Sequence, residues 1–232
     1  MTDSLMKALV QIWEYQARRP AIVCTGTQAL NRLIPIALSR TVEGKAVGNF
    51  LLGLYDGSEY RFDLTQLYHL NLRAFGDCMS VLQMDYLPEV EIHERIADGK
   101  SIWHQLLDQW GPLPPQDDCA DVHNLRTSAA SKQQRQAIET AGSLAFERLL
   151  QIAESGTGQS RTVGIFLMGL INGGNYRINL TDLRGLDLAV FEDCISVLRM
   201  DYLTETEELH HPLIVAILRT GVIEQEPKAV KP

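Results

Sequence analysis

The stretch VGNFLLGLYDGSEYRFDLTQLYHLNLRAFGDCMSVLQMDYL, residues 47–87, decides the fold, because the chain repeats it as VGIFLMGLINGGNYRINLTDLRGLDLAVFEDCISVLRMDYL at residues 163–203. Residue n of the first copy corresponds to residue n + 116 of the second without a gap. The match extends back to Ala21 in copy one and to Ala137 in copy two. The chain is therefore a tandem duplication of one small unit.

The start of each copy predicts an amphipathic helix, because apolar residues recur at i, i+3, i+4 and i+7. In copy one these residues are Val47, Phe50, Leu51 and Leu54. A glycine inside a helix costs about 1 kcal/mol relative to alanine. Gly48 has a counterpart at the same place in copy two, so we expect another backbone to pass close to this helix.

A short extended arm and a second helix complete each unit. Gly57 follows the first helix and is expected to supply the left-handed conformation of a helix end. Residues 60–62 then alternate like a strand, and Asp63 precedes a short helix as its N-cap. Residues 72–86 have the spacing of a second apolar helix face. The pattern predicts an all-α protein, two helical units related by an approximate two-fold axis, with a short arm in each.

Proline and glycine positions predict the boundaries of the parts. We expect an added helix over residues 1–20 that ends at Pro20, and a new helix capped by Thr25 or Thr27 that Pro35 ends or kinks. The predicted parts are the added helix 1–20, repeat one 21–110, a linker 111–125, repeat two 126–222 and a tail 223–232.

Bulk composition excludes several classes. A net charge of −8 argues against general affinity for a nucleic-acid backbone or an anionic membrane surface. The apolar runs are shorter than a membrane span, and the N-terminus lacks the pattern of a signal peptide. Four cysteines do not make a disulfide framework. We therefore expect a cytoplasmic protein.

Polar residues that are identical in both copies are the candidates for shared function. They include the pairs Arg32/Arg148, Tyr60/Tyr176, Arg61/Arg177, Thr65/Thr181, Asp77/Asp193, Ser80/Ser196 and Asp85/Asp201. An arginine beside an aromatic residue and two aspartates could form a phosphate or carboxylate site. We favour a structural tie in which Arg61 pairs with Asp77 or Asp85 within its own unit, and the same for copy two with Asp193 and Asp201.

No motif for catalysis or for a cofactor is present. Cys78 and Cys194 fall on an apolar helix face and are expected to be small buried hydrophobic residues. Cys119 and His123 have the spacing of metal ligands but no second pair, so we expect no metal site. Arg126, Lys132 and Arg135 form a basic segment that we interpret as a solvated helix face, with nucleic-acid contact as the alternative.

The runs FDLTQL in copy one and INLTDLRGLDLAVFEDCISVLRMD in copy two resemble an uncharacterised family of small bacterial proteins encoded on plasmids and integrative elements. The resemblance covers each repeat core. Copy one departs from the family pattern at Tyr68-His69, where the family has Arg-Gly. The resemblance implies a setting rather than an activity, because such elements often encode inhibitors of host defence.

We therefore expect a non-enzymatic, protein-binding protein that uses no cofactor. Two related surfaces held in one chain raise avidity for a partner. The sharper hypothesis is an anti-CRISPR-like inhibitor of an effector complex, and a homo-oligomer is also considered. We expect partner contacts through Tyr60, Arg61, Tyr176 and Arg177 and through the basic segment. The alternatives are a nucleic-acid-binding or transcriptional accessory protein, and an enzyme with carboxylates where the repeats meet.

Overall fold

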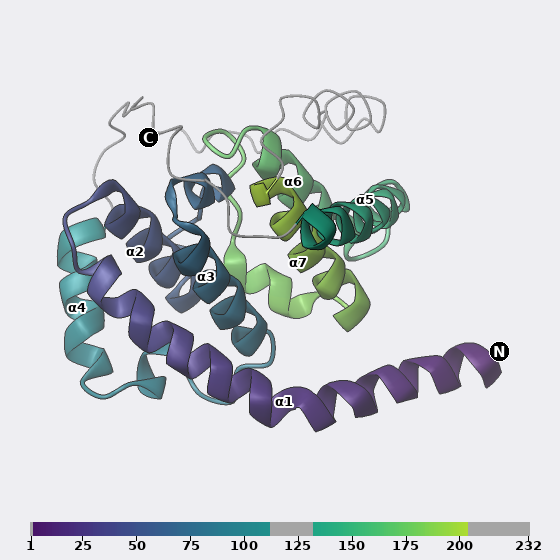
Figure 1. Cartoon of the computed structure of the whole chain (residues 1–232), viewed down its shortest axis with the longest axis horizontal. Coiled ribbons are helices and arrows are strands. Elements are labelled where there is room, and N and C mark those ends of the chain that lie inside the picture. Colours follow the sequence, from purple (N-terminus) through teal and green to yellow (C-terminus); the bar gives the residue numbers. More distant parts are fainter. Residues whose placement is uncertain (1, 112–131, 204–232) are drawn as a thin grey trace. The chain divides into compact units, whose positions relative to one another are not determined.

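A computed structural model describes residues 2–111 and 132–203, and these residues are almost all helical (Figure 1). The elements of copy one are α1 (Thr2–Ala37), α2 (Val42–Tyr55), η1 (Leu64–His69), α3 (Leu72–Asp85), η2 (Ile92–Arg95) and α4 (Gly99–Trp110). Those of copy two are α5 (Lys132–Glu154), α6 (Ser160–Ile171), η3 (Leu180–Gly185) and α7 (Leu188–Leu203). The prediction of an all-α tandem duplication is confirmed.

Helix α1 corrects the predicted N-terminal boundary. The chain does not end one helix at Pro20 and start another at Thr25 or Thr27, because α1 runs unbroken past both Pro20 and Pro35. A proline inside a helix costs about 3 kcal/mol, so packing must offset it. Arg19 supplies part of this packing, since its guanidinium donates to the carbonyl oxygens of Met84, at 2.8 Å, and of Leu87, near the end of α3.

Unit 1 is built around α2, which packs against α1, α3 and α4. Its N-cap is Thr41, whose hydroxyl accepts a hydrogen bond from the Gly44 amide at 2.9 Å. The ring of Trp110 lies against Gly48, and its Nε1–H donates to the carbonyl of Ala37 at 2.8 Å. We predicted that another backbone segment passes close to Gly48. The neighbour that requires a glycine at this position is instead the ring of Trp110.

Unit 2 repeats the same plan with α5, α6 and α7, in which α5 packs against both of the others. Ala145 and Leu149 of α5, Phe166 of α6 and Cys194 of α7 are fully buried in its core. The side chain of Gln159 bonds both the backbone and the side chain of Asp187, at 2.9 and 2.6 Å. This contact links the start of α6 to the residue before α7.

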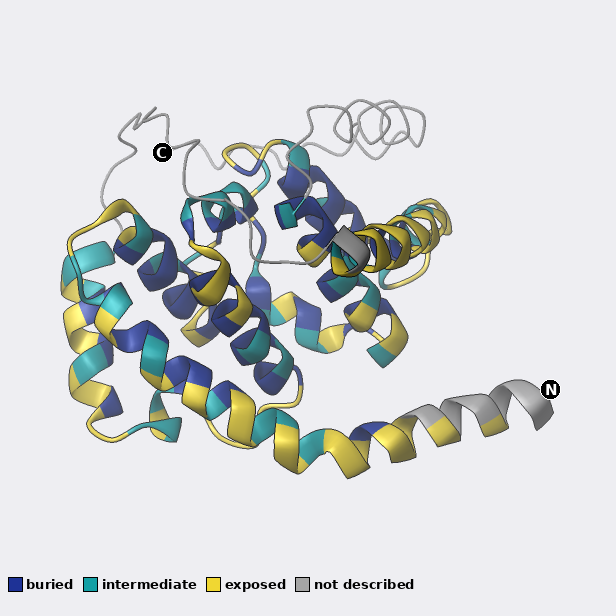
Figure 2. Cartoon of the chain, viewed as in Figure 1, coloured by how far each residue is buried: buried dark blue, intermediate teal, exposed yellow. Residues whose placement is uncertain are grey.

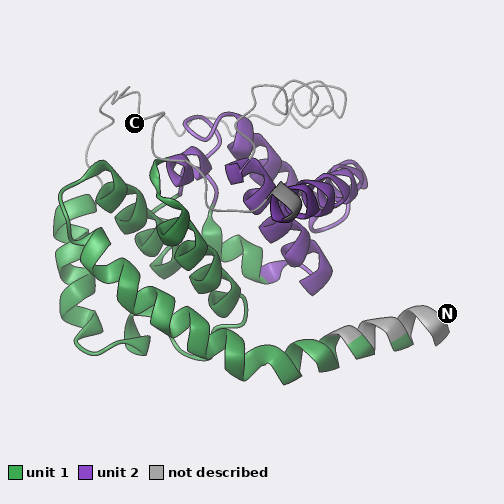
Figure 3. Ribbon diagram, viewed as in Figure 1, with its two compact units in different colours: residues 1–61, 69–126, 179–184 green, residues 62–68, 127–178, 185–232 purple. Residues whose placement is uncertain are grey.

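The two compact units do not coincide with the two sequence copies (Figure 3). Unit 1 contains the copy-one helices together with residues 179–184, which belong to copy two. Unit 2 contains the copy-two helices together with residues 62–68, which belong to copy one. The compact units therefore differ from the predicted parts 21–110 and 126–222, because each unit contains one segment of the other copy.

A β-bridge lies in unit 2, where the last residue of each arm meets its counterpart. Phe62 and Ile178 form an isolated antiparallel bridge, with N···O distances of 2.8 and 2.9 Å. Both side chains are 1% exposed. The predicted extended arm is thus confirmed, and it is limited to a single bridge among the described residues.

Candidate functional site

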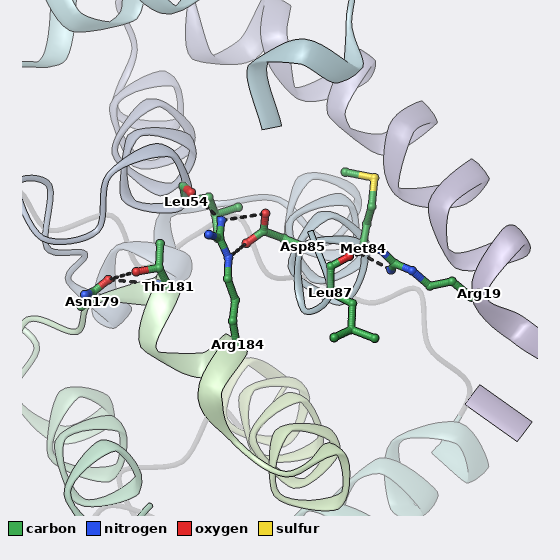
Figure 4. Close-up of polar contacts among 8 residues, drawn as sticks. All are labelled: Arg19, Leu54, Met84, Asp85, Leu87, Asn179, Thr181 and Arg184. Atoms are coloured by element: carbon green, nitrogen blue, oxygen red, sulfur yellow. Dashed lines mark hydrogen bonds and ion pairs between the residues drawn. The ribbon is translucent and has the colours of Figure 1, made fainter. Parts of the chain in front are cut away.

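Residues 179–184 bind in unit 1 at Asp85, Gly57 and the carbonyl of Leu54, and we call these groups the unit 1 seat. A buried ion pair lies at the centre of this seat. The Arg184 guanidinium donates to both carboxylate oxygens of Asp85, at 2.9 and 3.0 Å (Figure 4). Its Nη2 also donates to the Leu54 carbonyl oxygen at 2.9 Å. The side chains of Asp85 and Arg184 are 5% and 23% exposed. A bidentate arginine–carboxylate pair of this kind is among the strong ion pairs in proteins.

The seated segment is also shaped by its own cap. The Asn179 side-chain oxygen accepts hydrogen bonds from the amide and the hydroxyl of Thr181, at 3.0 and 2.7 Å (Figure 4). The same oxygen lies where a Cβ on Gly57 would stand. Gly57 does not have a positive φ, so its role is close approach rather than the left-handed helix end that we predicted.

Burial shapes the chemistry of Asp85. Desolvation raises the pKa of this carboxyl to about 6, and hydrogen bonding and charge from Arg184 oppose the rise. Arg95 also lowers the Asp85 pKa, and Glu91 raises it. The ion pair therefore offsets the cost of burying the carboxylate only in part.

The unit 2 seat, formed by Asp201 and Gly173, receives residues 62–68 in the equivalent way. At the position of Arg184, copy one has Tyr68, whose hydroxyl donates to the Asp201 carboxylate. Asp63 caps its own segment, accepting from the amide and hydroxyl of Thr65 at 2.9 and 2.6 Å. The Asp63 carboxylate also lies where a Cβ on Gly173 would stand. The unit 1 seat thus contains an ion pair, and the unit 2 seat contains a hydrogen bond from a phenol hydroxyl to a carboxylate.

The remaining shared aspartates form ion pairs near the surface, and their partner corrects a prediction. Arg32 holds Asp77 with two hydrogen bonds, at 2.9 and 2.6 Å, and Arg148 holds Asp193 at the same distances. We had predicted Arg61 as the partner of Asp77 or Asp85. That pairing is wrong, because Arg32 and Arg184 occupy those carboxylates.

The predicted partner-binding residues of the arms differ in exposure. Arg61 and Arg177 are exposed, and Tyr60 and Tyr176 beside them are half-buried. Burial raises the pKa of Tyr60, and the nearby acidic residues Glu59 and Asp56 add to the rise.

The basic segment is only partly described. Arg126 lies outside the described residues, and Lys132 begins α5 with a side chain that is also outside them. Arg135 is half-buried, at the position equivalent to Arg19. Its place in α5 therefore differs from the fully solvated helix face that we predicted.

Cysteine, metal and membrane chemistry can be stated for the described part of the chain. Cys78 and Cys194 are buried as predicted, and desolvation raises the pKa of both thiols. No group of three or more potential ligands within residues 2–111 and 132–203 is arranged to hold a metal ion. Cys119 and His123 lie outside those ranges. No helix among the described ones has the length and hydropathy needed to cross a membrane.

Two features escaped the sequence reasoning. Arg184 and Tyr68 differ between the copies, so a search for identical residues passed over them. The sequence feature that could have identified them is the departure of Tyr68-His69 from the family pattern. The second feature is the exposure of Trp13 in the N-terminal part of α1, which is 79% exposed.

The fold and the seats define a class: an all-α tandem repeat in which each unit is completed by a segment of the other copy. The chain belongs to a family of unknown function (DUF7673), which matches it twice, at residues 27–111 and 143–217. The two matches correspond to the two copies. No curated protein and no solved structure matches the chain.

Proposed function

We propose that this chain is a non-enzymatic protein-binding protein and that the N-terminal part of α1 is its docking element. The observation that carries the proposal is a set of large apolar side chains of α1 that are exposed. Figure 2 colours the ribbon by burial and shows yellow, exposed positions along the described part of this helix. Met6, Val10, Ile12 and Trp13 are 60%, 51%, 49% and 79% exposed. Clustered exposed apolar side chains are typical of interaction surfaces.

The spacing of these residues favours a helical docking mode. Met6, Val10 and Trp13 follow one another at intervals of four and three, the seam spacing of paired helices. Tyr15 faces the protein instead, because it is buried and its ring packs edge-on against Tyr86 at 5.9 Å. One side of α1 is thus anchored in unit 1, and Met6, Val10 and Trp13 are available to enter an apolar groove of a partner.

The position of the docking element also supports the proposal. The residue equivalent to Lys132, where α5 begins, is Gln16. The part of α1 before Gln16 therefore has no described counterpart in copy two. The last residue of the exposed stripe is Trp13, and tryptophan is one of the residue types enriched at binding hot spots.

The sharper form of the proposal is that the partner is a host defence complex, such as a CRISPR effector complex. Its support is the resemblance to proteins of plasmids and integrative elements, in which defence inhibitors are common. This form names a partner class that can be purified and tested.

The experiment measures binding of the full-length chain to purified effector complexes, together with protection of a targeted plasmid in cells. We expect binding, and we expect Trp13→Ala to weaken it by about 2 kcal/mol, the cost of a hot-spot tryptophan. Leu144→Ala is the matched control, because Leu144 is an exposed apolar residue on another helix, at 52%. Absence of both binding and protection would remove the defence-complex hypothesis, and equal loss in both variants would remove the docking role of α1.

A nucleic-acid-binding function is the second candidate, and the exposure of Arg61 and Arg177 is the observation that favours it. The net charge of −8 opposes it. A gel shift that weakens steeply between low and high salt, and that Arg61→Ala reduces, would support this candidate over the first.

A further inference from the structure

Unit 1 contains a second cluster of side chains, formed by the end of α2, by η2 and by α4. Three aromatic rings meet there: Tyr55, His93 and Trp103. The ring centroids of Tyr55 and His93 are 5.3 Å apart, those of His93 and Trp103 are 6.2 Å apart, and those of Tyr55 and Trp103 are 6.3 Å apart. Trp103 is 2% exposed, whereas Tyr55 is 38% exposed and opens the cluster to solvent.

The polar atoms of this cluster are unusual. Trp103 Nε1, His93 Nδ1 and Arg95 Nη2 are all buried and have no hydrogen-bond partner in the part of the chain that the structure describes. A buried polar group without a partner costs about 1–3 kcal/mol. Trp103 and Arg95 can only donate hydrogen bonds, and His93 can donate from Nδ1. Trp103 Nε1 and Arg95 Nη2 therefore require an acceptor, and His93 can donate to the same acceptor in the tautomer that carries its proton on Nδ1.

The local charge favours a negative acceptor. Leu54, next to Tyr55, binds Arg184 through its carbonyl, and Arg184 neutralises Asp85. Arg95 of η2 acts on the same carboxylate through its charge, and its Nη2 has no hydrogen-bond partner among the described residues. Arg184 is thus committed to Asp85, whereas one nitrogen of the Arg95 guanidinium still requires an acceptor.

The backbone holds the cluster in a tight conformation. Asp98 has a φ of 55°, in the left-handed region that residues other than glycine rarely adopt. The neighbouring Gly99 allows the carbonyl of His93 to approach its Cα, where a Cβ would collide with it. The turn before α4 therefore fixes η2 against α4.

Copy two does not share these residues. Tyr55 corresponds to Ile171 at the 116-residue offset, the sequences of the copies diverge after Leu87 and Leu203, and residues 204–232 contain no tryptophan. Packing that both copies share therefore does not explain the buried indole N–H of Trp103.

We propose that Arg95, Trp103 and His93 form a binding site for a small oxyanion, a carboxylate or a phosphate, that is specific to unit 1. The guanidinium and the indole N–H donate to the oxyanion, and the rings of Tyr55 and His93 shield these hydrogen bonds from water. Charge-assisted hydrogen bonds of this kind are about twice as strong as neutral ones.

The test follows the indole N–H signals of the full-length protein by nuclear magnetic resonance. Inorganic phosphate and benzoate are titrated separately, with sodium chloride at matched ionic strength as the control. We expect a saturable shift of the Trp103 signal at millimolar concentrations of one probe or both. The Trp110 signal should stay in place, because its N–H is already bound to the Ala37 carbonyl. The two titrations distinguish a phosphate site from a carboxylate site.

Variants decide whether the named residues make the site. Arg95→Met should raise the dissociation constant about tenfold or more, because it removes the charged donor. Arg73→Met, on the exposed surface of α3, should leave it unchanged. A Trp103 signal that fails to shift with either probe, or that shifts equally in Arg95→Met, would overturn the proposal.

Discussion

The two seats occupy equivalent positions in the two units but use different chemistry. In the unit 1 seat, the Arg184 guanidinium forms a bidentate ion pair with Asp85 and bonds a backbone carbonyl as well. In the unit 2 seat, the Tyr68 hydroxyl donates to Asp201. The buried aspartate is thus common to both seats, whereas the hydrogen-bond donor differs with the segment that each seat receives. The difference also predicts that the two seats are unequal in stability.

The largest expected effect comes from removing the charged donor. Arg184→Met leaves Asp85 buried without its cation, and breaking such a pair costs about 3 kcal/mol. Urea denaturation at pH 7.5 would measure this loss in the free energy of unfolding. Arg73→Met, an exposed arginine on α3, is the control and should cost less than about 0.5 kcal/mol. A loss as small as that of the control would mean that the ion pair does not hold the segment.

Titration of Asp85 sharpens the comparison, because its pKa is raised to about 6 from 3.8. A carboxyl whose folded pKa is raised contributes stability that is present below its unfolded pKa and is lost as the pH rises through about 6. The wild type should therefore lose up to about 3 kcal/mol relative to Asp85→Asn between pH 4 and pH 7. Denaturation curves of both proteins across this range give the measurement. A gain in the stability of the wild type relative to Asp85→Asn as the pH rises would contradict the raised pKa.

The glycines that admit the segments should behave alike in the two seats. Gly57→Ala places a methyl group against Asn179, and Gly173→Ala places one against Asp63. Each should cost about 2 kcal/mol through overpacking. Gly76→Ala is the matched control, because nothing lies within 4 Å of its Cβ position in α3. That variant should stabilise the protein by up to about 1 kcal/mol, and a similar gain at Gly57 would show that no segment lies there.

The smallest expected effect is at the tyrosine of the unit 2 seat. Tyr68→Phe removes one hydroxyl and keeps the ring, so it should cost about 1 kcal/mol. Thermal denaturation would register this as a modest fall in Tm. If Tyr68→Phe costs as much as Arg184→Met, the two seats do not differ in the way that their donors suggest.

Much of the fold could be predicted from the sequence because local signals and the duplication agree. The apolar spacing predicted α2 and α3 with their counterparts α6 and α7, and Asp63 and Asn179 act as the predicted caps. The same apolar spacing occurs in both copies, so each copy independently supports the helices predicted for the other. Fold class therefore followed from periodicity alone.

The exchange of segments could not be predicted, because a duplicated sequence has identical local preferences for either pairing. Asp85 and Asp201 lie in equivalent helices, and nothing local tells Arg184 which of them to bind. The long helix α1 was missed for a related reason: Pro20 is a strong local signal, and tertiary contacts of Arg19 outweigh it. Both errors arise where long-range packing decides between locally similar choices.

The account depends most on the claim that each unit is completed by a segment of the other copy. A double-mutant cycle tests it directly, combining Arg184→Met first with Asp85→Asn and then with Asp201→Asn. We predict a coupling energy above about 1 kcal/mol for Arg184 with Asp85, which are 99 residues apart, and none for Arg184 with Asp201 of its own copy. Coupling to Asp201 and not to Asp85 would contradict the exchange, because it would place the segment back in the copy from which it comes.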